Sequence, residues 1–415
     1  MEIYHELSVG LTDDDRALKE HIHRFAKEVL RPSAMALDEM TPEQVIAKGS
    51  VYWDVWRQIK ELGLHKRGLP EHLGGITLSP IQSCILMEEL SWGSIDWAVA
   101  FGASSMPYIF ANVIGTPRLI EEVVVPYVED KDGTWIGCWA ITEPARGYDV
   151  MLTFVEGSGI SFDTRAKLDG DNWIISGQKS AWVSNGTVAK HALTFVSAET
   201  EDPGEPSVGV CVVSLDQPGV SKGKPLNKIG QRALNQGEIF FDEVVVPRNE
   251  MVIFPRRKPG EAPVGGTGFN PNAALGVAFV GVARAAFEET LEYCKNRVQG
   301  GAPLVEHQLV QRKLFDMMTK VETARAYARA VSLYNSANPL GFGFYSNAAK
   351  IYATQVAYEI ADQGVQLHGG IGLCKGMLIE KLFRDARAGL IEDGANDSLA
   401  LSAAPLMVRN YVYSR

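Results

Sequence analysis

Apolar residues recur at helical spacing through the first third of the chain. The segment LTDDDRALKEHIHRFAKEVLRP (residues 11–32) begins at a threonine followed by acids, the usual start of a helix, and ends at Pro32. The stretch VYWDVWRQIKELGLHKRGLP is amphipathic and closes at Gly63, and residues 79–115 supply two further runs that are apolar enough to be buried. This pattern predicts an N-terminal helical domain over residues 1–130.

The periodicity changes near Asp132. Short β-rich runs now alternate with Gly, Asp and Pro, namely GTWIGCWAITEP, ISFDTRAKLDGDNWIISGQKSAWVSNG, HALTFVSAE, VGVCVVSLD and NQGEIFFDEVVVP. The DGDNW segment within them is typical of a hairpin turn. These runs predict a middle antiparallel, β-barrel-like domain over residues 131–262, ending in the polar Gly/Pro-rich linker FPRRKPGEAPVGGTGFNPN.

Helical periodicity returns at Ala273. Three stretches are each longer than an average helix and apolar at i, i+3, i+4 and i+7: AALGVAFVGVARAAFEETLEYCKNRV, EHQLVQRKLFDMMTKVETARAYARAVSLYN and NAAKIYATQVAYEIADQGVQLHG. They predict a C-terminal four-helix bundle over residues 263–415. The expected class is therefore α+β, with helices before and after a single β domain.

Composition narrows the range of functions. The chain has 415 residues, of which 46% are hydrophobic and 22% charged, as expected for a globular protein with more than one core. A net charge of −10 argues against a nucleic-acid partner. The five cysteines form no CxxC pair, so reduced thiols, a cytoplasmic location and no metal site are expected. No signal peptide and no apolar run of about 18 residues is recognised, so no membrane insertion is expected.

Two adjacent carboxylates near the C-terminus are candidates for chemistry. Glu392 and Asp393 directly precede Gly394, and Asn396 follows two residues later, in GLIEDGANDSLAL. A carboxylate in an apolar pocket can act as a general base. The same acids can also form the solvated N-terminus of a last helix, and the residues alone leave both interpretations open.

Six segments occur in order along the chain: WAITEPARGYD, GQKSAWVSNG, FFDEVVVP, RVQGGAPLVEHQ, QLHGGIG and RDARAGLIEDGAN. Together they resemble the acyl-CoA dehydrogenase superfamily of FAD enzymes over essentially the whole chain. The resemblance implies FAD-dependent dehydrogenation of an acyl-CoA thioester, with electrons passed to an electron-transferring flavoprotein or similar carrier. It also implies a homotetramer or a dimer.

The first two segments are similar to the flavin side of the family's site. By this resemblance Thr142 bonds the flavin pyrimidine edge, Trp182 covers the isoalloxazine and Ser184 places a hydroxyl near N5 or the phosphate. Gly147 and Tyr148 would contact substrate, with Tyr148 standing where the family has a serine. Taken alone, Thr142 is an ordinary strand residue and Trp182 a core residue.

The later segments are similar to the family's adenosine side, which is partly completed across a subunit interface. The matching residues are Arg297, Gln299, His307, Gln308, Gln366, Gly369 and Gly370. An arginine fork suits a pyrophosphate because it donates two directed, charge-assisted bonds. Alone, glycine pairs are usually turns and an arginine at a helix end is usually solvated. Gly300 stands where the family commonly has phenylalanine.

The last segment sets the register of the base. Aligning Arg384-Asp385-Ala386 and Gly394 with the family places Asp393 at its glutamate position and Glu392 at a neighbouring tyrosine. The resemblance thus gives Asp393 the catalytic role with Glu392 as a second candidate, Gly394 a substrate contact and Asn396 a cofactor contact. Because aspartate is one methylene shorter, a bulky, branched or cyclic acyl group is expected.

Other acids are weaker candidates for the base. Some family members carry it on the first C-terminal helix, which falls near Pro271, where no acid stands. Glu88, Glu89 and Asp96 lie on predicted helices and are interpreted as surface or capping residues.

Two alternative functions remain open on the sequence. An aspartate before Gly-x-Asn also resembles nitroalkane oxidases, a branch of the same superfamily. That branch has an arginine seven residues later, where this chain has Ala400, and a serine partner, where it has Pro271 or Asn272. A low-turnover flavin-binding homologue is the other alternative, because Tyr148, Gly300 and Ala395 replace family residues.

Overall fold

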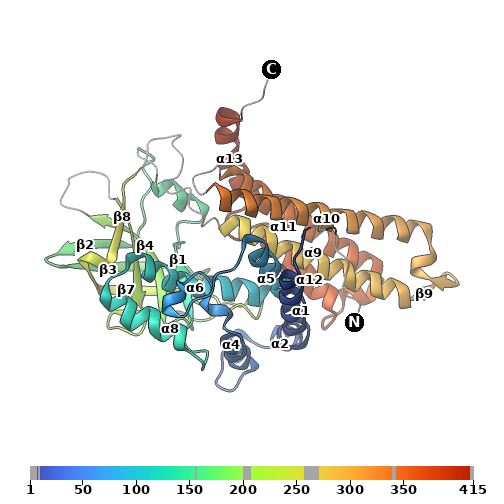
Figure 1. Ribbon diagram of the computed structural model, residues 1–415, viewed down its shortest axis with the longest axis horizontal. Helices are drawn as coiled ribbons and strands as arrows, with labels where there is room; N and C mark the ends of the chain where they lie inside the picture. Colours follow the sequence, from blue (N-terminus) through green and yellow to red (C-terminus); the bar gives the residue numbers. More distant parts are fainter. Residues whose placement is uncertain are drawn as a thin grey trace.

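The fold has three parts in the order predicted, helices, a sheet and helices again (Figure 1). The computed structural model describes residues 7, 10–154, 157–199, 207–256, 271–338 and 343–411. The sheet lies at one end of the molecule and the C-terminal bundle at the other, with the N-terminal helices packed between and beneath them.

The N-terminal part begins at Thr12, whose side chain and Asp15 form a reciprocal capping box. Contrary to the prediction, the helix does not stop at Pro32. It continues through a single π turn to Asp38, and Pro32 falls in the first turn of the next helical segment, where its missing N–H costs little. The elements here are α1 (Asp13–Phe25), η1 (Ala26–Leu30), α2 (Arg31–Asp38), α3 (Pro42–Val45), α4 (Val51–Glu61), η2 (Leu64–Lys66), η3 (Glu71–Leu73), α5 (Pro80–Gly93), α6 (Ile95–Ile114), α7 (Pro117–Leu119), η4 (Ile120–Val124) and α8 (Val125–Glu129).

The middle part is a mixed, open sheet. Its strands are β1 (Gly137–Ala140), β2 (Arg165–Asp169), β3 (Asn172–Lys179), β4 (His191–Glu199), β5 (Ser207–Ser214), β6 (Val220–Lys222), β7 (Ile239–Pro247) and β8 (Met251–Phe254). They are ordered β6-β7-β3-β2-β4-β5-β8, with β1 also beside β4. Both β1 and β2 run parallel to β4, and no pairing among the described residues joins β6 to β8. The predicted middle β domain is confirmed, but among the described residues its sheet is mixed and open rather than antiparallel and barrel-like.

Local turn chemistry was predicted correctly within this sheet. Strands β2 and β3 form an antiparallel hairpin in which Asp169 pairs with Asn172 across a turn of Gly170 and Asp171. Gly170 adopts a φ of 56°, a left-handed conformation that glycine accepts without a steric penalty.

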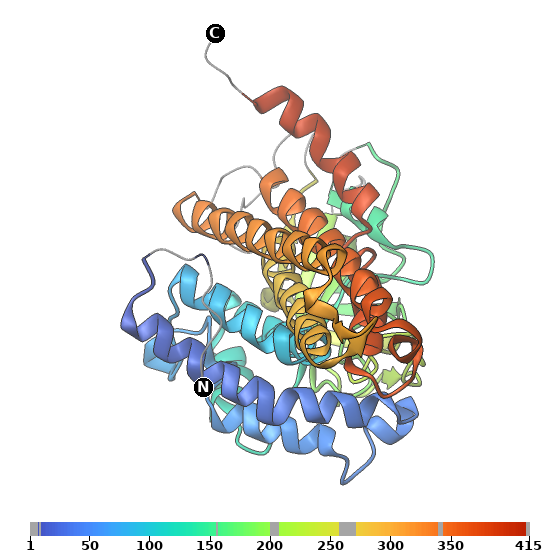
Figure 2. The same cartoon turned by 90° about the vertical axis from the view of Figure 1, so that its right-hand side faces the viewer.

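The C-terminal part is the predicted four-helix bundle. Helices α9 (Pro271–Asn296), α10 (Gln308–Ala337), α11 (Phe344–His368) and α12 (Leu378–Gly389) pack on one another. The short strands β9 (Val298–Gln299) and β10 (Ala302–Pro303), with η7 (Leu304–Glu306), join α9 to α10, and η8 (Gly369–Leu373) follows α11. A last helix, α13 (Asn396–Asn410), projects away from the body (Figure 2).

The two helical parts share one hydrophobic core. It joins residues of α4–α6 to residues of α9–α12, and α5 lies directly against α9. Helix α6 is long and apolar enough to cross a membrane by length and composition alone, but its apolar side chains contribute to these cores.

The central strand β4 is buried on both faces. Ala192 and Val196 face a core inside the sheet domain, whereas Leu193 packs in a second core with Tyr108 of α6 and Tyr127 of α8. The N-terminal helices therefore cover one face of the sheet, and α6 packs against β1, after which the predicted flavin-side residue Thr142 follows.

Candidate active site

The base loop, residues 390–395, connects α12 to α13. Asp393 has a φ of 50° and Gly394 a φ of 105°, so two consecutive residues are left-handed. A Cβ added to Gly394 would lie 2.6 Å from Cδ2 of Tyr148, which makes glycine necessary at this position. For Asp393 the conformation is sparsely populated and marks the loop as held by its surroundings.

Both carboxyl groups of the base loop have pKa values above their usual range. Glu392 is half-buried, and its Oε1 accepts a bond of 2.8 Å from Nε2 of Gln231. Burial and the neighbouring Asp393 raise the pKa of Glu392 to about 7. Asp393 is exposed along the open side of the loop, yet enough protein surrounds it to disfavour its charge and raise its pKa. A carboxylate with a raised pKa suits a general base at neutral pH.

A buried lysine holds the base loop from α11. Nζ of Lys350 donates to the carbonyl oxygen of Gly394 at 2.8 Å and to Oδ1 of Asn396 at 2.9 Å. Nδ2 of Asn396 donates to Oγ1 of Thr354 at 3.0 Å. The Asn396 amide is thus engaged within the protein, and its cofactor contact stays a prediction.

The predicted substrate residues meet at this loop. Tyr148 begins η5 (Tyr148–Phe154) and lays its ring against Gly394, while its hydroxyl lies 3.2 Å from Oγ of Ser402 on α13. Gly147 precedes it and lines an adjoining pocket. The structure therefore brings the WAITEPARGYD segment into contact with the base loop, although the two are far apart in sequence.

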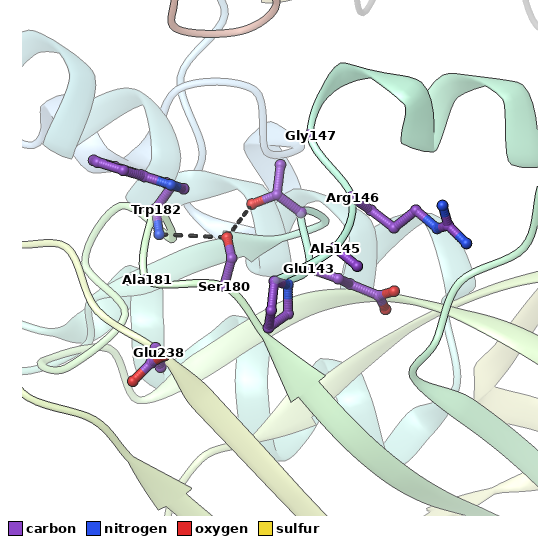
Figure 3. Close-up of a pocket in the computed structure, with 10 residues that line it drawn as sticks. Glu143, Ala145, Arg146, Gly147, Ser180, Ala181, Trp182 and Glu238 are labelled. Atoms are coloured by element: carbon purple, nitrogen blue, oxygen red, sulfur yellow. Dashed lines mark hydrogen bonds between the residues drawn. The ribbon is translucent and has the colours of Figure 1, made fainter.

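An open pocket of about 420 Å³ lies beside Gly147, at the ends of β1 and β3. Figure 3 shows Trp182 on one side of Ser180, and Glu143 and Arg146 on the other. Oγ1 of Thr142 lies 2.6 Å from Oγ of Ser180, and the Trp182 side chain is 62% exposed. Trp182 is therefore not a core residue, and its ring is free to cover a planar group.

The floor of this pocket is built from buried polar contacts. Oε1 of Glu143 accepts from the N–H of Thr164 at 2.9 Å and pairs with Nζ of Lys179 at 2.7 Å. Gln236 orients the next segment, donating from Nε2 to the carbonyl of Trp182 at 3.1 Å and to Oγ of Ser184 at 3.3 Å. Thr142, Trp182 and Ser184 thus lie in neighbouring segments, and their contacts with a flavin stay a prediction.

The predicted adenosine-side residues form a separate group at the end of the bundle. Nε2 of His307 lies 2.8 Å from the carbonyl oxygen of Gln299 in the β9–β10 hairpin. Tyr293 stacks on His368 with ring centroids 4.0 Å apart, which places this hairpin beside η8. Arg297, Gln308, Gln366, Gly369 and Gly370 are all exposed here. This end of the bundle is the one farthest from the sheet (Figures 1 and 2).

The three other candidate acids are buried in ion pairs, so their interpretation as surface residues is wrong. Glu88 accepts from Nη1 of Arg284 at 2.8 Å and from Nη2 of Arg325 at 2.9 Å, and Glu89 shares the Arg284 guanidinium. Asp96 pairs with Nζ of Lys381 at 3.0 Å. These arginines and Lys381 hold the pKa of all three carboxyls below their usual range, so none is a spare base.

Sequence reasoning missed Lys350, Gln231 and Gln236. Gln231 is buried and has a φ of 48°. Its backbone N–H donates to Asp385, which fixes the position from which its side chain donates to Glu392. The available signal was a single lysine in the otherwise small and apolar run NAAKIYATQVA, with Thr354 one turn later. A charged residue on such a face must find a buried partner.

Comparisons with known proteins cover all three parts of the chain. The acyl-CoA dehydrogenase N-terminal, middle and C-terminal domain families match residues 12–129, 138–244 and 267–404. The chain belongs to the acyl-CoA dehydrogenase family.

The relatives of this acyl-CoA dehydrogenase span it almost completely. Short-chain specific acyl-CoA dehydrogenase from Bos taurus mitochondria is 30% identical over 97% of this chain and 92% of its own. Benzylmalonyl-CoA dehydrogenase from Aromatoleum aromaticum is 29% identical over 96% and 99%. Among solved structures, butyryl-CoA dehydrogenase from Megasphaera elsdenii superposes with a TM-score of 0.80 at 23% identity over 97% and 100% of the two chains.

Acyl-CoA dehydrogenases bind FAD, and the pocket beside the base loop suits a flavin. It offers a flat, exposed indole from Trp182 and paired hydroxyls from Thr142 and Ser180. The Ser184 hydroxyl, two residues after Trp182, is oriented by Gln236. In the part of the chain that the structure describes, no three His, Cys, Asp or Glu side chains gather as metal ligands.

Proposed function

We propose that this acyl-CoA dehydrogenase oxidises the Cα–Cβ bond of an acyl-CoA thioester with Asp393 as the base. The supporting observation is the base loop itself. A carboxylate with a raised pKa stands on a left-handed turn, against Tyr148 and beside the pocket that suits a flavin. A general base requires both its position and its pKa to be set, and contacts from α11 and the middle domain set them.

The reaction assigns one task to each group of residues. The Asp393 carboxylate takes the α-proton as that C–H bond breaks. FAD, when bound, accepts the hydride that leaves Cβ, which yields the α,β-double bond. The N–H of Asp393 faces the thioester oxygen and stabilises the negative charge that develops there. Glu392 stays beside the base, bonded to Gln231.

Two chains together hold the cofactor in this proposal. Thr142, Trp182 and Ser184 bind the flavin, and Trp182 excludes water from the reacting face. The adenosine side is held by the bundle end of a partner subunit, through Arg297, Gln299, His307, Gln308, Gln366, Gly369 and Gly370. The separation of the two groups within one chain supports this division (Figure 1). The expected assembly is a homotetramer or a dimer.

The substrate and the electron carrier are proposed from chemistry and from relatives. Because Asp393 is shorter than a glutamate, a bulky, branched or cyclic acyl group fits best. The relative that acts on benzylmalonyl-CoA is in keeping with this class. The electron acceptor is an electron-transferring flavoprotein or similar carrier. A solved structure named for the electron transferring flavoprotein of Acidaminococcus fermentans superposes on this chain with a TM-score of 0.81 at 23% identity.

Anaerobic titration of the purified yellow protein tests the function. The panel contains butyryl-CoA, isobutyryl-CoA, cyclohexanecarboxyl-CoA and nitroethane, and the loss of flavin absorbance is followed. Bleaching by one or more of the acyl-CoAs, with no response to nitroethane, is the expected result. Bleaching by nitroethane alone would replace the proposal with nitroalkane oxidation. Failure of every compound would favour a flavin-binding homologue with little turnover.

A further inference from the structure

Lys350 is a fully buried cation that donates hydrogen bonds to the base loop and to the first residue of α13. It is 0% exposed and lies where α11 crosses α9 closely, since a Cβ on Gly276 would lie 3.2 Å from the Lys350 backbone nitrogen. Its two bonds go to the Gly394 carbonyl and the Asn396 amide oxygen, both neutral acceptors. Neither bond neutralises its charge, so a buried lysine is held here at an electrostatic cost.

The bond to Gly394 accounts for the shape of the loop. Left-handed φ angles at Asp393 and Gly394 turn the Gly394 carbonyl toward α11, where Lys350 donates to it. A charge-assisted bond is about twice as strong as a neutral one and can offset the strain of a left-handed aspartate. Thr354, one turn further along α11, accepts a hydrogen bond from the same Asn396 side chain, so α11 holds the start of α13 at two points.

The charge of Lys350 also acts on the carboxylates. Burial lowers the pKa of Lys350 to about 8, while Glu392 and Asp393 oppose that shift, so the lysine is mostly protonated at neutral pH. In return Lys350 counteracts the raised pKa of both acids. From the middle domain the Gln231 hydrogen bond and the Lys228 charge also lower the pKa of Glu392. Helix α9 presents Gly276, and α13 presents the neutral Asn396.

We infer that Lys350 is the positioning residue of the catalytic base: it holds Asp393 in its left-handed conformation and favours its ionised form. The inference rests on the proposed function for the role of Asp393, but its structural half concerns the loop alone. Lys350 touches neither substrate nor the reacting atoms, so it acts only through the loop.

Hydrogen–deuterium exchange of the holoenzyme tests the structural half. In Lys350→Met the peptide covering residues 389–401 is expected to exchange about ten-fold faster, with other peptides unchanged. Lys222→Met is the matched control, because Lys222 is a half-buried lysine that donates to a carbonyl, that of Ala189, away from the loop. If Lys350→Met does not fold, Asn396→Ala removes one acceptor and is expected to give a smaller local increase. Unchanged exchange in 389–401, or an increase spread over the whole chain, would overturn the inference.

The pH profile of anaerobic flavin bleaching tests the electrostatic half. With butyryl-CoA, or the panel thioester that bleaches the wild type fastest, the midpoint is expected to rise by about 1–2 pH units in Lys350→Met. Lys350→Arg keeps the charge and is expected to stay near the wild-type midpoint. An unmoved midpoint in Lys350→Met would contradict the inference. If no acyl-CoA bleaches the wild type, the proposed function fails, and the exchange result still decides whether Lys350 holds the loop.

Discussion

At the scale of single residues, two adjacent carboxylates meet different surroundings. Glu392 is half-buried and bonded to Gln231, whereas Asp393 is exposed and precedes Gly394, which lies against Tyr148. A base needs an unobstructed carboxylate at a fixed position. The surroundings therefore favour Asp393 as the base and leave Glu392 as its bonded neighbour.

Replacing Asp393 with Asn is expected to slow flavin bleaching by an acyl-CoA by about 10²–10⁴-fold, because the amide cannot take a proton. Stopped-flow absorbance under anaerobic conditions measures it. Glu392→Gln keeps the acceptor for Gln231 and is the control, with a much smaller loss expected. Equal losses in the two variants would remove the distinction between the two acids.

In the wild type the rate of flavin bleaching is expected to rise with pH through the raised pKa of Asp393, since only the ionised carboxylate accepts the proton.

The raised pKa of Glu392 is also expected to make the stability of the protein depend on pH. Its pKa is raised from 4.5 to about 7 in the folded protein, so the folded state binds more protons than the unfolded state between these values. The ionised carboxylate therefore destabilises the fold, and this effect grows as pH rises from about 4.5 through 7. Glu392→Gln is expected to raise the melting temperature more at pH 8 than at pH 5. Thermal unfolding followed by circular dichroism checks this, and a pH-independent difference would contradict it.

At the scale of elements, one buried ion cluster joins three helices. Glu88 of α5 pairs with Arg284 of α9 and Arg325 of α10, all nearly inaccessible. Removing one partner of a buried pair leaves an uncompensated charge, which typically costs about 3–5 kcal/mol. An exposed pair on the same helix α10, Arg312 with Asp316, contributes little.

Glu88→Gln is accordingly expected to lower the free energy of unfolding by about 3–5 kcal/mol, because Arg284 and Arg325 each lose one of their buried counter-charges. Asp316→Asn, which breaks the exposed pair, should cost below about 0.5 kcal/mol. Urea denaturation followed by tryptophan fluorescence gives both values. A small loss for Glu88→Gln would mean that the remaining acids, Glu89, Glu288 and Glu322, neutralise the arginines.

What the sequence predicts about these elements depends on how local the determining contacts are. The Thr12 cap and the turn at Gly170 are set by residues within one turn, and both were predicted correctly. The parallel pairing of β1 and β2 with β4 joins segments far apart in the chain, so alternation alone could not reveal it. The resemblance places the base at residue 393, but it does not reveal the hydrogen bond from Lys350 to Gly394. Lys350 becomes buried only when α9, α11 and the base loop pack together.

At the scale of the whole molecule, the proposed cofactor residues form two groups that one chain keeps apart. The flavin-side pocket lies near the sheet and the β9–β10 hairpin lies at the far end of the bundle (Figure 1). Large apolar side chains are exposed around that far end and along α13: Val298, Leu309, Phe315, Leu373, Leu401 and Val408. Exposed apolar surface of this extent is typical of a protein–protein interface, so partner subunits are expected to cover it.

The double variant Leu309→Glu with Phe315→Glu tests this arrangement on α10. Because charged side chains would be buried against the partner, the dissociation constant of the assembly is expected to rise at least about ten-fold, as measured by sedimentation velocity. Val113→Glu is the control, since Val113 is equally exposed, at 68%, but lies near the end of α6. Bound flavin should fall together with the assembly if a partner holds the adenosine side. Dissociation without loss of flavin would mean that one chain binds the whole cofactor, and an unchanged assembly would place the interface elsewhere than on this face of α10.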